Sequence, residues 1–297
     1  MSNFKTGKSS LFNNLSLIWN RVAPNWAEGE ITSQLYLRNT QQTKKFKLPR
    51  GIEQRSIKTP GGEICTYKTG KGPTVVFVHG WGGGAYQFFS LMRGVKECGF
   101  TALAFDHLGH QNSENKPATI QQLISTTNYI LQKVIKNHPN GLTALVGHDI
   151  GCMVITNTKP ELIRNLPLFF ISPIFNYKLH FLKKLSKLNL HPDILKKYAS
   201  QFTASYKKEY AKLELAKTLE KYSDVSVIAH DNNDTVAPIS ESIKFCKKLP
   251  ITKLLITKEW DHDRIINSES VWQELKSHLN YDDTTINFSK ITPTDYS

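Results

Sequence analysis

Short apolar runs rich in β-branched residues recur along the chain, and longer segments with helical periodicity separate them. Parallel strands that are buried on both faces read as continuous apolar runs, and a helix usually connects one such strand to the next. This alternation predicts βαβ units, that is, an α/β fold with a mostly parallel central sheet and helices on both of its faces. The clearest predicted strands begin at Thr74, Thr101, Leu142, Pro167, Val225 and Ile251.

Two further strands are expected before this series, at one edge of the sheet. Residues 52–57 and 63–69 read as strands, and the sequence KTPGGE between them has the proline and glycines typical of a turn. We therefore predict an antiparallel hairpin along the edge of the parallel sheet. Five segments are predicted to be helices, which are residues 86–98, 120–137, 151–157, 240–248 and 268–279.

The connection between the strands at Pro167 and Val225 is much longer than a crossover needs. It contains about fifty residues of mostly helical pattern, whereas the loops of βαβ units usually have about 2–6 residues. We predict that residues 173–222 form an inserted helical cap, which divides the core into residues 52–172 and 223–280. The remaining predicted segments are a partly helical lead-in at residues 1–51 and a loose tail at residues 281–297.

The chain has 297 residues, of which 39% are hydrophobic, enough to bury one large core or two smaller ones. No stretch approaches the roughly 20 consecutive apolar residues of a membrane span, so no stable membrane insertion is expected, and a cytoplasmic location follows by default. The four cysteines lie far apart, without histidines at metal-ligand spacing. No disulfide framework, metal site or other cofactor is therefore predicted.

The formal net charge of +13 at pH 7 comes in large part from the predicted cap, where residues 178–221 contain 11 lysines and four acidic residues. Leucines recur there at helical spacing, as is typical of amphipathic helices whose lysines face solvent, and no nucleic-acid-binding motif accompanies them. We therefore expect a small-molecule substrate rather than a nucleic acid. The cap lysines should point outward, and leucines and at least one tyrosine should face the substrate. The sequence does not indicate an oligomeric state.

The strand that begins at Leu142 leads into the sequence Gly147-His-Asp-Ile-Gly151. In a sharp strand-to-helix turn of the form G-x-S-x-G, called a nucleophile elbow, small residues let the backbone fold tightly and expose the central side chain at an active site. Asp149 occupies the central position here, where serine is usual. Asp149 is therefore either a working nucleophile or a residue that has replaced a nucleophilic serine.

A glycine-rich segment, FVHGWGGGAYQF, follows the strand that begins at Thr74. Glycines at the end of a strand can turn the backbone N–H of Trp81 or Gly82 towards an active site, where it supplies half of an oxyanion hole. The N–H of Ile150, directly after the elbow, would supply the other half. A phosphate-binding loop is the rival interpretation, but no Gly-Lys-Ser/Thr follows and the G-x-G-x-x-G spacing is absent. Trp81 and Ile150 are therefore the predicted oxyanion-hole residues.

An acid and a histidine follow the elbow at the ends of two later strands. Asp234 lies in a D-x-x-x-P sequence after a strand, and Asp231 in the same loop is the second candidate acid. His262 follows the last predicted strand. Nucleophile, acid and histidine is the chain order of hydrolases that use an elbow. We therefore predict that Asp149, Asp234 and His262 converge at the carboxyl ends of the strands, with the histidine between the two carboxylates.

In this order, the glycine-rich loop, the elbow, the D-x-x-x-P acid and the late histidine resemble the α/β-hydrolase superfamily over residues 52–279. The resemblance implies the α/β-hydrolase fold and a hydrolase activity. The segments AFDHLGH, HDNNDTVAP and WDHDRII look most similar to bacterial serine carboxylesterase-like members, whose elbow would read G-H-S-x-G. The form G-H-D-x-G is found in epoxide hydrolases and haloalkane dehalogenases. The chain thus resembles esterases in outline and aspartate-type enzymes at one residue.

Departures from the aspartate-type enzymes narrow the expected chemistry. Gly82 stands where those enzymes usually have a proline, and Ile150 where a tryptophan usually follows the nucleophile. The predicted cap contains no tryptophan that would bind a halide, so halide release is not expected. Epoxide opening needs phenolic donors on the leaving oxygen, and the cap has tyrosines for this role, although aromatic residues on amphipathic helices commonly serve packing. The candidate substrate-binding residues are Tyr177, Tyr198 and Tyr206.

The chemistry of a carboxylate separates the remaining hypotheses. Attack by Asp149 on an acyl ester would give a mixed anhydride, whose collapse expels the carboxylate more readily than an alkoxide. Attack on the sp³ carbon of a strained or activated electrophile gives a stable alkyl ester, against which His262, oriented by Asp234, can activate water. We therefore expect an epoxide-hydrolase-like reaction. The alternatives are a carboxylesterase-like chain in which Asp149 stands in place of serine and has little activity, and a ligand-binding module without catalysis.

Overall fold

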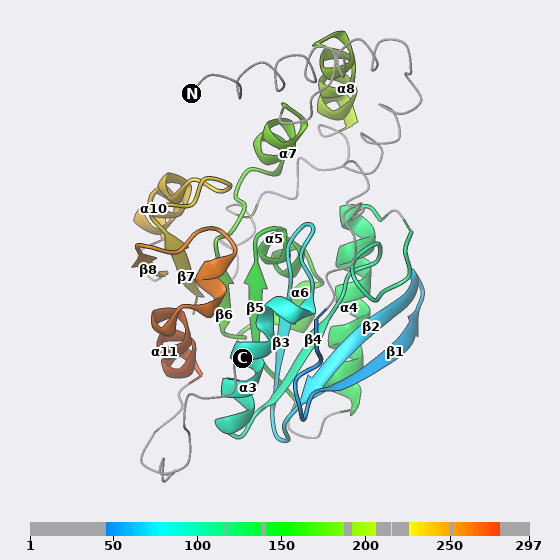
Figure 1. Ribbon diagram of the computed structural model, residues 1–297, viewed down its shortest axis with the longest axis vertical. Helices are drawn as coiled ribbons and strands as arrows, with labels where there is room; N and C mark the ends of the chain where they lie inside the picture. The colour runs from blue at the N-terminus through cyan, green and yellow to red at the C-terminus, as the bar shows by residue number, and fades with distance from the viewer. Residues whose placement is uncertain are drawn as a thin grey trace, which may run out of the picture.

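The computed structural model describes residues 46–116, 118–137, 141–186, 192–205, 215, 226–249 and 252–279 (Figure 1). The predicted tail and the first 45 residues of the chain lie outside these ranges, and so does most of the second half of the predicted cap. The division of the chain into lead-in, core, cap and tail therefore stays a prediction.

The sheet at the centre of the described residues has eight strands. They are β1 (Glu53–Thr59), β2 (Gly62–Thr69), β3 (Thr74–Val78), β4 (Thr101–Phe105), β5 (Leu142–His148), β6 (Leu168–Ile171), β7 (Ser226–Asp231) and β8 (Lys253–Thr257). Their order in space is β1-β2-β4-β3-β5-β6-β7-β8. β1 and β2 form the predicted antiparallel hairpin, β2 pairs antiparallel with β4, and the other pairings are parallel. The expected mostly parallel sheet is therefore confirmed.

Helices cover both faces of this sheet (Figure 1). The α-helices of the described residues are α3 (Phe89–Glu97), α4 (Ile120–Asn137), α5 (Ile150–Thr156), α6 (Pro160–Ile163), α7 (Tyr177–Ser186), α8 (Pro192–Ser205), α10 (Ile239–Lys248) and α11 (Glu269–His278). Two 3₁₀ helices accompany them, η1 (Ala85–Phe88) and η3 (Arg264–Asn267). The five helices expected outside the cap are present with nearly the expected bounds. The first of them is divided into η1 and α3.

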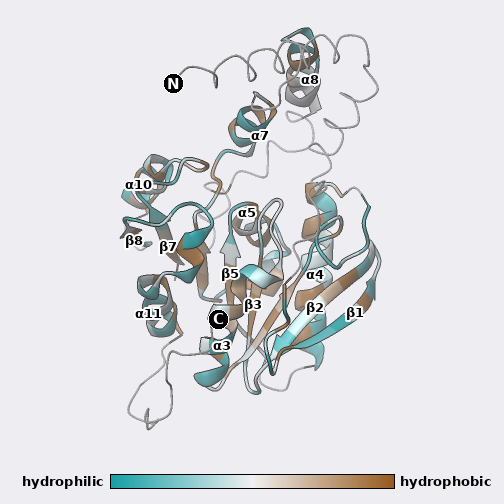
Figure 2. Cartoon of the chain, in the orientation of Figure 1, coloured by the Kyte–Doolittle hydropathy of each residue, from teal (hydrophilic) through white to brown (hydrophobic). Residues whose placement is uncertain are grey.

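The central strands are mostly apolar because helices bury them from both sides. All five residues of β3 are buried, and successive side chains point to opposite faces. Val76 and Val78 pack into one apolar cluster with α4 and α5, and Val75 and Phe77 pack into a second cluster with α3 and α11. Figure 2 shows the hydrophobic residues concentrated on these inner strands, whereas β1 at the edge is largely hydrophilic.

The helices α7 and α8 lie on the side of the sheet where the parallel strands end (Figure 1). Tyr177, Phe181 and Leu185 of α7 are buried in the apolar cluster that contains α4 and α5. The ring of Phe181 is stacked with that of Trp81, at 6.3 Å between ring centroids. These contacts place α7 over the loop that follows β3. In the part of the chain that the structure describes, every helix is too short or too polar to cross a membrane.

Candidate active site

The turn between β5 and α5 has the geometry predicted for an elbow. Asp149 has φ 55° and ψ −124°, a conformation that is strained for a residue with a side chain. A Cβ atom at position 151 would lie 2.1 Å from the backbone oxygen of Val78, and one at position 147 would lie 2.9 Å from the backbone of Cys152. Gly147 and Gly151 therefore let α5 pack close to β3 and β5 while Asp149 projects from the turn.

The two carboxylate oxygens of Asp149 have different surroundings. The residue is only 3% exposed. Its Oδ2 accepts a hydrogen bond from the backbone N–H of Trp81 at 2.8 Å. Its Oδ1 accepts no hydrogen bond from the described residues and lies 3.4 Å from Nε2 of His262. One oxygen thus contacts the predicted oxyanion-hole donor, and the other faces the histidine.

The structure distinguishes between the two loop amides that the sequence left open. The N–H of Gly82 donates to Nε2 of His110 at 3.1 Å, whereas the N–H of Trp81 points to Asp149. Trp81 is therefore the loop residue whose amide reaches the site. Ile150 is the first residue of α5, and amides at this end of a helix lack intrahelical acceptors. Its role as the second donor stays a prediction.

Buried histidines hold the rest of this loop. His79 donates from Nδ1 to the carbonyl of Gly80 at 2.7 Å and accepts at Nε2 from the N–H of His107 at 2.9 Å. His110 also donates from Nδ1 to the carbonyl of Leu108 at 3.0 Å. Each of the two rings thus donates at one nitrogen and accepts at the other, which requires the neutral form. The loop is therefore fixed by uncharged imidazoles packed beneath it.

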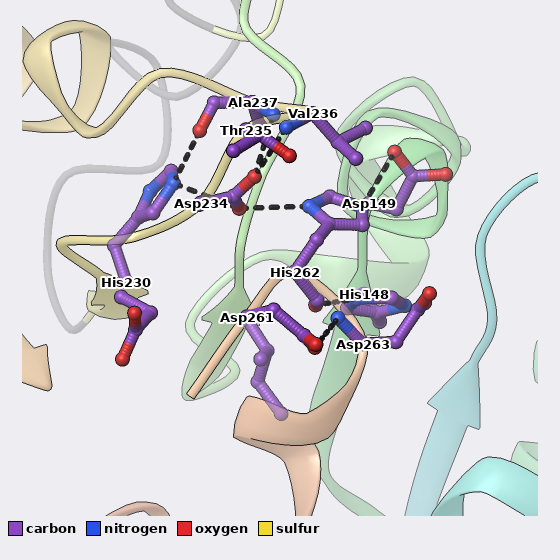
Figure 3. A network of polar contacts seen from close by, with 12 residues as sticks. His148, Asp149, His230, Asp234, Thr235, Val236, Ala237, Asp261, His262 and Asp263 are labelled. Atoms are coloured by element: carbon purple, nitrogen blue, oxygen red, sulfur yellow. Dashed lines mark hydrogen bonds and ion pairs between the residues drawn. The ribbon is translucent and has the colours of Figure 1, made fainter. Parts of the chain in front are cut away.

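His262 lies between Asp149 and Asp234, as Figure 3 shows. Its Nδ1 is 2.7 Å from Oδ2 of Asp234. The other oxygen of Asp234 accepts hydrogen bonds from the backbone N–H groups of Val236 and Ala237, both at 2.8 Å. The carboxylate is thereby fixed by its own loop, and it in turn fixes the ring of His262.

Asp231, the second candidate acid, has a different environment. It accepts hydrogen bonds from the N–H of Asn233, the hydroxyl of Thr257 and the N–H of Trp260. These contacts tie the ends of β7 and β8 together, and the carboxylate partner of His262 is Asp234. The structure therefore favours the first choice made from the sequence.

Sequence reasoning missed two histidines that position this group. His148 donates from Nε2 to the backbone oxygen of His262 at 2.8 Å, and the two rings lie 4.9 Å apart between centroids. His230 places its Nε2 at 3.2 Å from Oδ2 of Asp234, while its Nδ1 is 2.7 Å from the hydroxyl of Ser242. Both histidines lie inside sequence segments that the elbow and the acid had already singled out, but their contacts depend on tertiary structure.

Mutual attraction keeps the three central groups charged. Burial alone would raise the pKa of Asp149, but the adjacent His262 outweighs burial, and the pKa stays below its ordinary range. Burial likewise opposes ionisation of Asp234, but hydrogen bonds from His230 and His262 lower its pKa. Burial would lower the pKa of His262, but its contacts with the two carboxylates raise the pKa to about 10. At neutral pH the resting site therefore holds an imidazolium between two carboxylates.

The Asp149→Asn variant is expected to have a lower pKa at His262 than the unmodified protein, because one of the two neighbouring negative charges is removed. The measurement is an NMR titration of the imidazole ring signals in both proteins. Glu269→Gln is the matched control, because Glu269 is exposed on α11 and its carboxylate contacts Gln273 rather than His262. An unchanged titration in Asp149→Asn would contradict the charge pair described here.

Two neighbouring cavities lie at this end of the sheet. The first has a volume of about 130 Å³, and its lining includes Trp81, Asp149, Lys184 and His262. The second has a volume of about 170 Å³ and a mainly apolar lining that includes Ile174, Phe175, Leu179 and Pro238. Val236 lines both cavities, so this residue lies where they meet.

Two of the three predicted substrate-binding tyrosines, Tyr177 and Tyr198, do not line the cavity at Asp149. Tyr177 is 3% exposed and packs in the apolar core. Tyr198 is partly buried and packs against the same core cluster. Neither lines either cavity. Tyr206 lies outside the described residues.

The expectation that the cap lysines all point outward is wrong for Lys184. This residue lines the cavity at Asp149, and its Nζ lies 4.0 Å from the ring centroid of Trp81. The indole ring attracts the ammonium group and offers an apolar surface to its methylene groups. A charge pattern along a helix cannot reveal such a contact, because Trp81 is remote in sequence.

One group of three side chains in the described residues has ligand atoms close enough to hold a metal ion. Atoms of His148, His262 and Asp263 lie within 4.8 Å of one another. However, Nε2 of His148 is bonded to a backbone oxygen, and Nδ1 of His262 is bonded to Asp234. A metal would have to take the nitrogen of His262 that faces Asp149. We therefore interpret these contacts as part of the arrangement around His262.

Comparisons with known proteins agree with this architecture. A protein-family model described as "alpha/beta hydrolase fold" matches residues 73–159. A search of curated protein sequences finds no match. Among solved structures, an esterase of Pyrococcus furiosus is 17% identical with a TM-score of 0.62, and the alignment covers 82% of this chain and 98% of the esterase.

Two further solved structures represent different chemistries. Est1E from Butyrivibrio proteoclasticus is 15% identical with a TM-score of 0.58, covering 76% of this chain and 99% of its own. The epoxide hydrolase VrEH1 from Vigna radiata is 16% identical with a TM-score of 0.57, covering 79% of this chain and 99% of its own. At such identities the likeness shows the fold alone. The family match includes the loop after β3 and the elbow, and together with the fold it supports an assignment to the α/β-hydrolase superfamily.

Proposed function

We propose that the protein is a hydrolase that forms a covalent ester through Asp149 with an sp³ carbon of a small, partly apolar substrate, and that the substrate is an epoxide. The observation that carries the proposal is the asymmetry of the Asp149 carboxylate. Oδ2 is held by the N–H of Trp81, while Oδ1 accepts no hydrogen bond from the described residues and forms an ion pair with His262, 3.4 Å from its Nε2. A carboxylate oriented in this way has one oxygen fixed by a hydrogen bond, and the other is placed beside the general base as the attacking oxygen.

In the first step, Oδ1 of Asp149 attacks a carbon of the epoxide ring, and the carbon–oxygen bond breaks. The electron pair of that bond goes to the epoxide oxygen, which takes up a proton and becomes a hydroxyl. The carbonyl oxygen of the new ester is Oδ2, which already contacts the N–H of Trp81. The donor therefore stands where negative charge develops when this ester is later hydrolysed.

In the second step, His262 acts as a general base. Its high pKa in the resting protein depends partly on the negative charge of Asp149. Formation of the ester removes that charge, so the pKa of His262 falls and the ring can release its proton. The neutral imidazole, oriented by Asp234, then takes a proton from water as the water attacks the ester carbonyl. Collapse of the tetrahedral intermediate restores the carboxylate and releases a diol.

The two cavities suit a neutral substrate with an apolar arm. The reacting carbon would lie in the cavity at Asp149, and the arm would extend past Val236 into the apolar cavity. An acyl ester fits the chemistry less well, because attack by a carboxylate gives an anhydride that reverts. The first measurement is therefore a turnover screen of epoxides and acyl esters.

The location of a water oxygen tests the covalent step. In a single turnover in ¹⁸O water, the label is expected in the Asp149 carboxylate, and the product receives an oxygen that belonged to Asp149. The measurement is the mass of the peptide that contains Asp149, with protein incubated without substrate as the control. Label found wholly in the product after proven turnover would end the assignment.

The same screen with Asp149→Ser separates the alternatives. Esterase activity that appears only in the serine variant would favour a carboxylesterase-like chain in which aspartate has replaced serine. Loss of epoxide turnover in the variant supports the aspartate mechanism. Specific binding without turnover in either protein would indicate a ligand-binding module on the same fold.

A further inference from the structure

The helix α7 brings a positive charge to the cavity at Asp149. Lys184 lines this cavity, and its Nζ lies 4.0 Å from the ring centroid of Trp81, the residue whose backbone N–H binds Asp149. The side chain is partly buried, and α7 is anchored on both sides of it by buried Phe181 and Leu185. A fixed helix therefore holds the ammonium group over Trp81, at the cavity that Asp149 also lines.

Electrostatics support the same placement. Burial raises the pKa of Asp149, and the charges that oppose this effect include His262 and also Lys184. His180, one turn earlier on α7, is buried, and its pKa is lowered to about 4, mainly by burial and with a contribution from Lys184. Lys184 is thus the cation that α7 contributes to the site, because His180 is neutral at physiological pH.

We propose that Lys184 is a catalytic residue that donates the proton to the oxygen leaving the attacked carbon. This inference rests on the proposed covalent reaction of Asp149. An alkoxide is a poor leaving group, so epoxide opening at neutral pH needs an acid at the ring oxygen. Among the tyrosines that the structure describes, none lines the cavity at Asp149. An ammonium group supplies three N–H donors, and Lys184 brings such a group to this cavity.

The proton balance of the step is complete. As Oδ1 of Asp149 bonds to the carbon and the ring opens, a proton passes from Nζ of Lys184 to the oxygen, leaving a neutral amine and a hydroxyl. When the ester forms, His262 releases its proton, and that proton recharges the amine of Lys184 through solvent. During ester hydrolysis His262 takes one proton from water and regains its charge, and the second proton of that water goes to the leaving alkoxide as the Asp149 carboxylate is restored. The net reaction is epoxide plus water to diol.

The test compares two epoxides with the same carbon skeleton whose leaving oxygens differ in basicity. The probes are 1,2-epoxypropane and 3,3,3-trifluoro-1,2-epoxypropane, because the trifluoromethyl group makes the alkoxide a weaker base that needs less protonation. The rate of alkylation of Asp149 is followed by mass spectrometry in the His262→Gln background, in which the ester accumulates. Lys184→Met removes the ammonium group and keeps an unbranched side chain over Trp81. Lys178→Met, at a partly buried lysine of α7 that lines neither cavity, is the matched control.

Lys184→Met is expected to slow alkylation by 1,2-epoxypropane at least about 100-fold and by the trifluoro epoxide less than about 10-fold. Lys178→Met should change both rates less than about two-fold. Lys184→Arg keeps the positive charge, but arginine gives up its proton poorly. Its rate of alkylation by 1,2-epoxypropane should therefore lie between the rate of the His262→Gln protein with Lys184 intact and the rate of Lys184→Met.

If Lys184→Met slows alkylation by both epoxides equally, or slows neither, Lys184 is not the acid, and the covalent mechanism still stands. If the parent with Lys184 intact forms no ester with either epoxide, the proposed function itself fails. The two failures are therefore distinguishable in one set of measurements. Thermal unfolding of each variant shows whether the fold is retained.

Discussion

The His262→Gln variant is expected to accumulate an alkyl ester on Asp149 and to release product at a rate about 10²–10⁴-fold below that of the unmodified protein. The physical reason is that alkylation uses Oδ1 of Asp149, whereas ester hydrolysis needs a base for water. Glutamine keeps a polar side chain of similar reach but cannot accept the proton. The measurement is the mass of the intact protein after mixing with an epoxide, together with steady-state turnover.

Asp231→Asn serves as the control for His262→Gln, because Asp231 lies in the same region but contacts Thr257 and Trp260 rather than His262. It should not accumulate ester. A His262→Gln protein that turns over epoxide at the original rate, with no mass increase, would refute the general-base assignment. Release of product at the original rate in a variant that does form the ester would also refute the general-base assignment.

The second large effect concerns acid stability. The free energy of unfolding is expected to fall steeply between about pH 6.5 and about pH 4, because three buried histidines support the glycine-rich loop in their neutral form. Burial is the main cause in each case: it lowers the pKa of His107 to about 3 and of His110 to about 4, and it holds the pKa of His79 well below its ordinary value. In the unfolded chain these groups titrate near pH 6.5.

At pH values between the folded and the unfolded pKa of these histidines, the unfolded chain binds protons that the folded protein does not bind. Each such histidine therefore removes about 1.4 kcal/mol of stability for each unit by which the pH falls. Asp106 acts in the opposite direction, because burial raises its pKa to about 6. Below about pH 6, the three loop histidines against one carboxylate give a net slope on the order of 3 kcal/mol per pH unit, and His148, His180 and His278, whose pKa values burial also lowers, make the fall steeper.

The ion pairs of the site do not contribute to the fall in stability between about pH 6.5 and about pH 4. The lowered pKa values of Asp149 and Asp234 contribute stability that is present above the unfolded aspartate pKa, near 4, and is lost below it. The raised pKa of His262 contributes stability that is complete below about pH 6.5 and is lost as the pH rises towards 10. Acid and alkaline unfolding therefore have different causes in this protein.

Urea unfolding at a series of pH values measures this slope. His107→Phe is the most informative variant, because both ring nitrogens of His107 lack hydrogen-bond partners in the structure and the ring packs against Phe105. It removes one titrating group, so the slope should become shallower by about 1.4 kcal/mol per pH unit. A stability that stays constant between about pH 6.5 and pH 4.5 would contradict the neutral state of these histidines.

Much of the site follows from local sequence because strand ends and glycine-rich turns have local causes. The strand pattern predicted the sheet, and the glycines around Asp149 predicted the turn that the close approach to Val78 requires. The chain order of Asp149, Asp234 and His262 placed three distant residues in one region. Local sequence also ranked Asp234 above Asp231, and the structure makes Asp234 the partner of His262.

The contacts that depend on how remote elements pack could not be predicted. Whether Trp81 or Gly82 faces the site depends on His110, which takes up the amide of Gly82. The direction of Lys184 depends on the ring of Trp81. The amphipathic pattern of α7 places Tyr177 on the buried face of that helix, but the pattern does not say whether this face meets the core or the substrate.

Val236 joins substrate selection to the orientation of the acid through two separate parts of one residue. Its backbone N–H binds the carboxylate of Asp234, while the residue also lines both cavities. The hydrogen bond belongs to the main chain, so it survives most replacements of the side chain. Mutation at this position can therefore alter which molecules fit without disturbing the group that orients His262, and the substrate range of such a protein can diverge during evolution while its reaction is preserved.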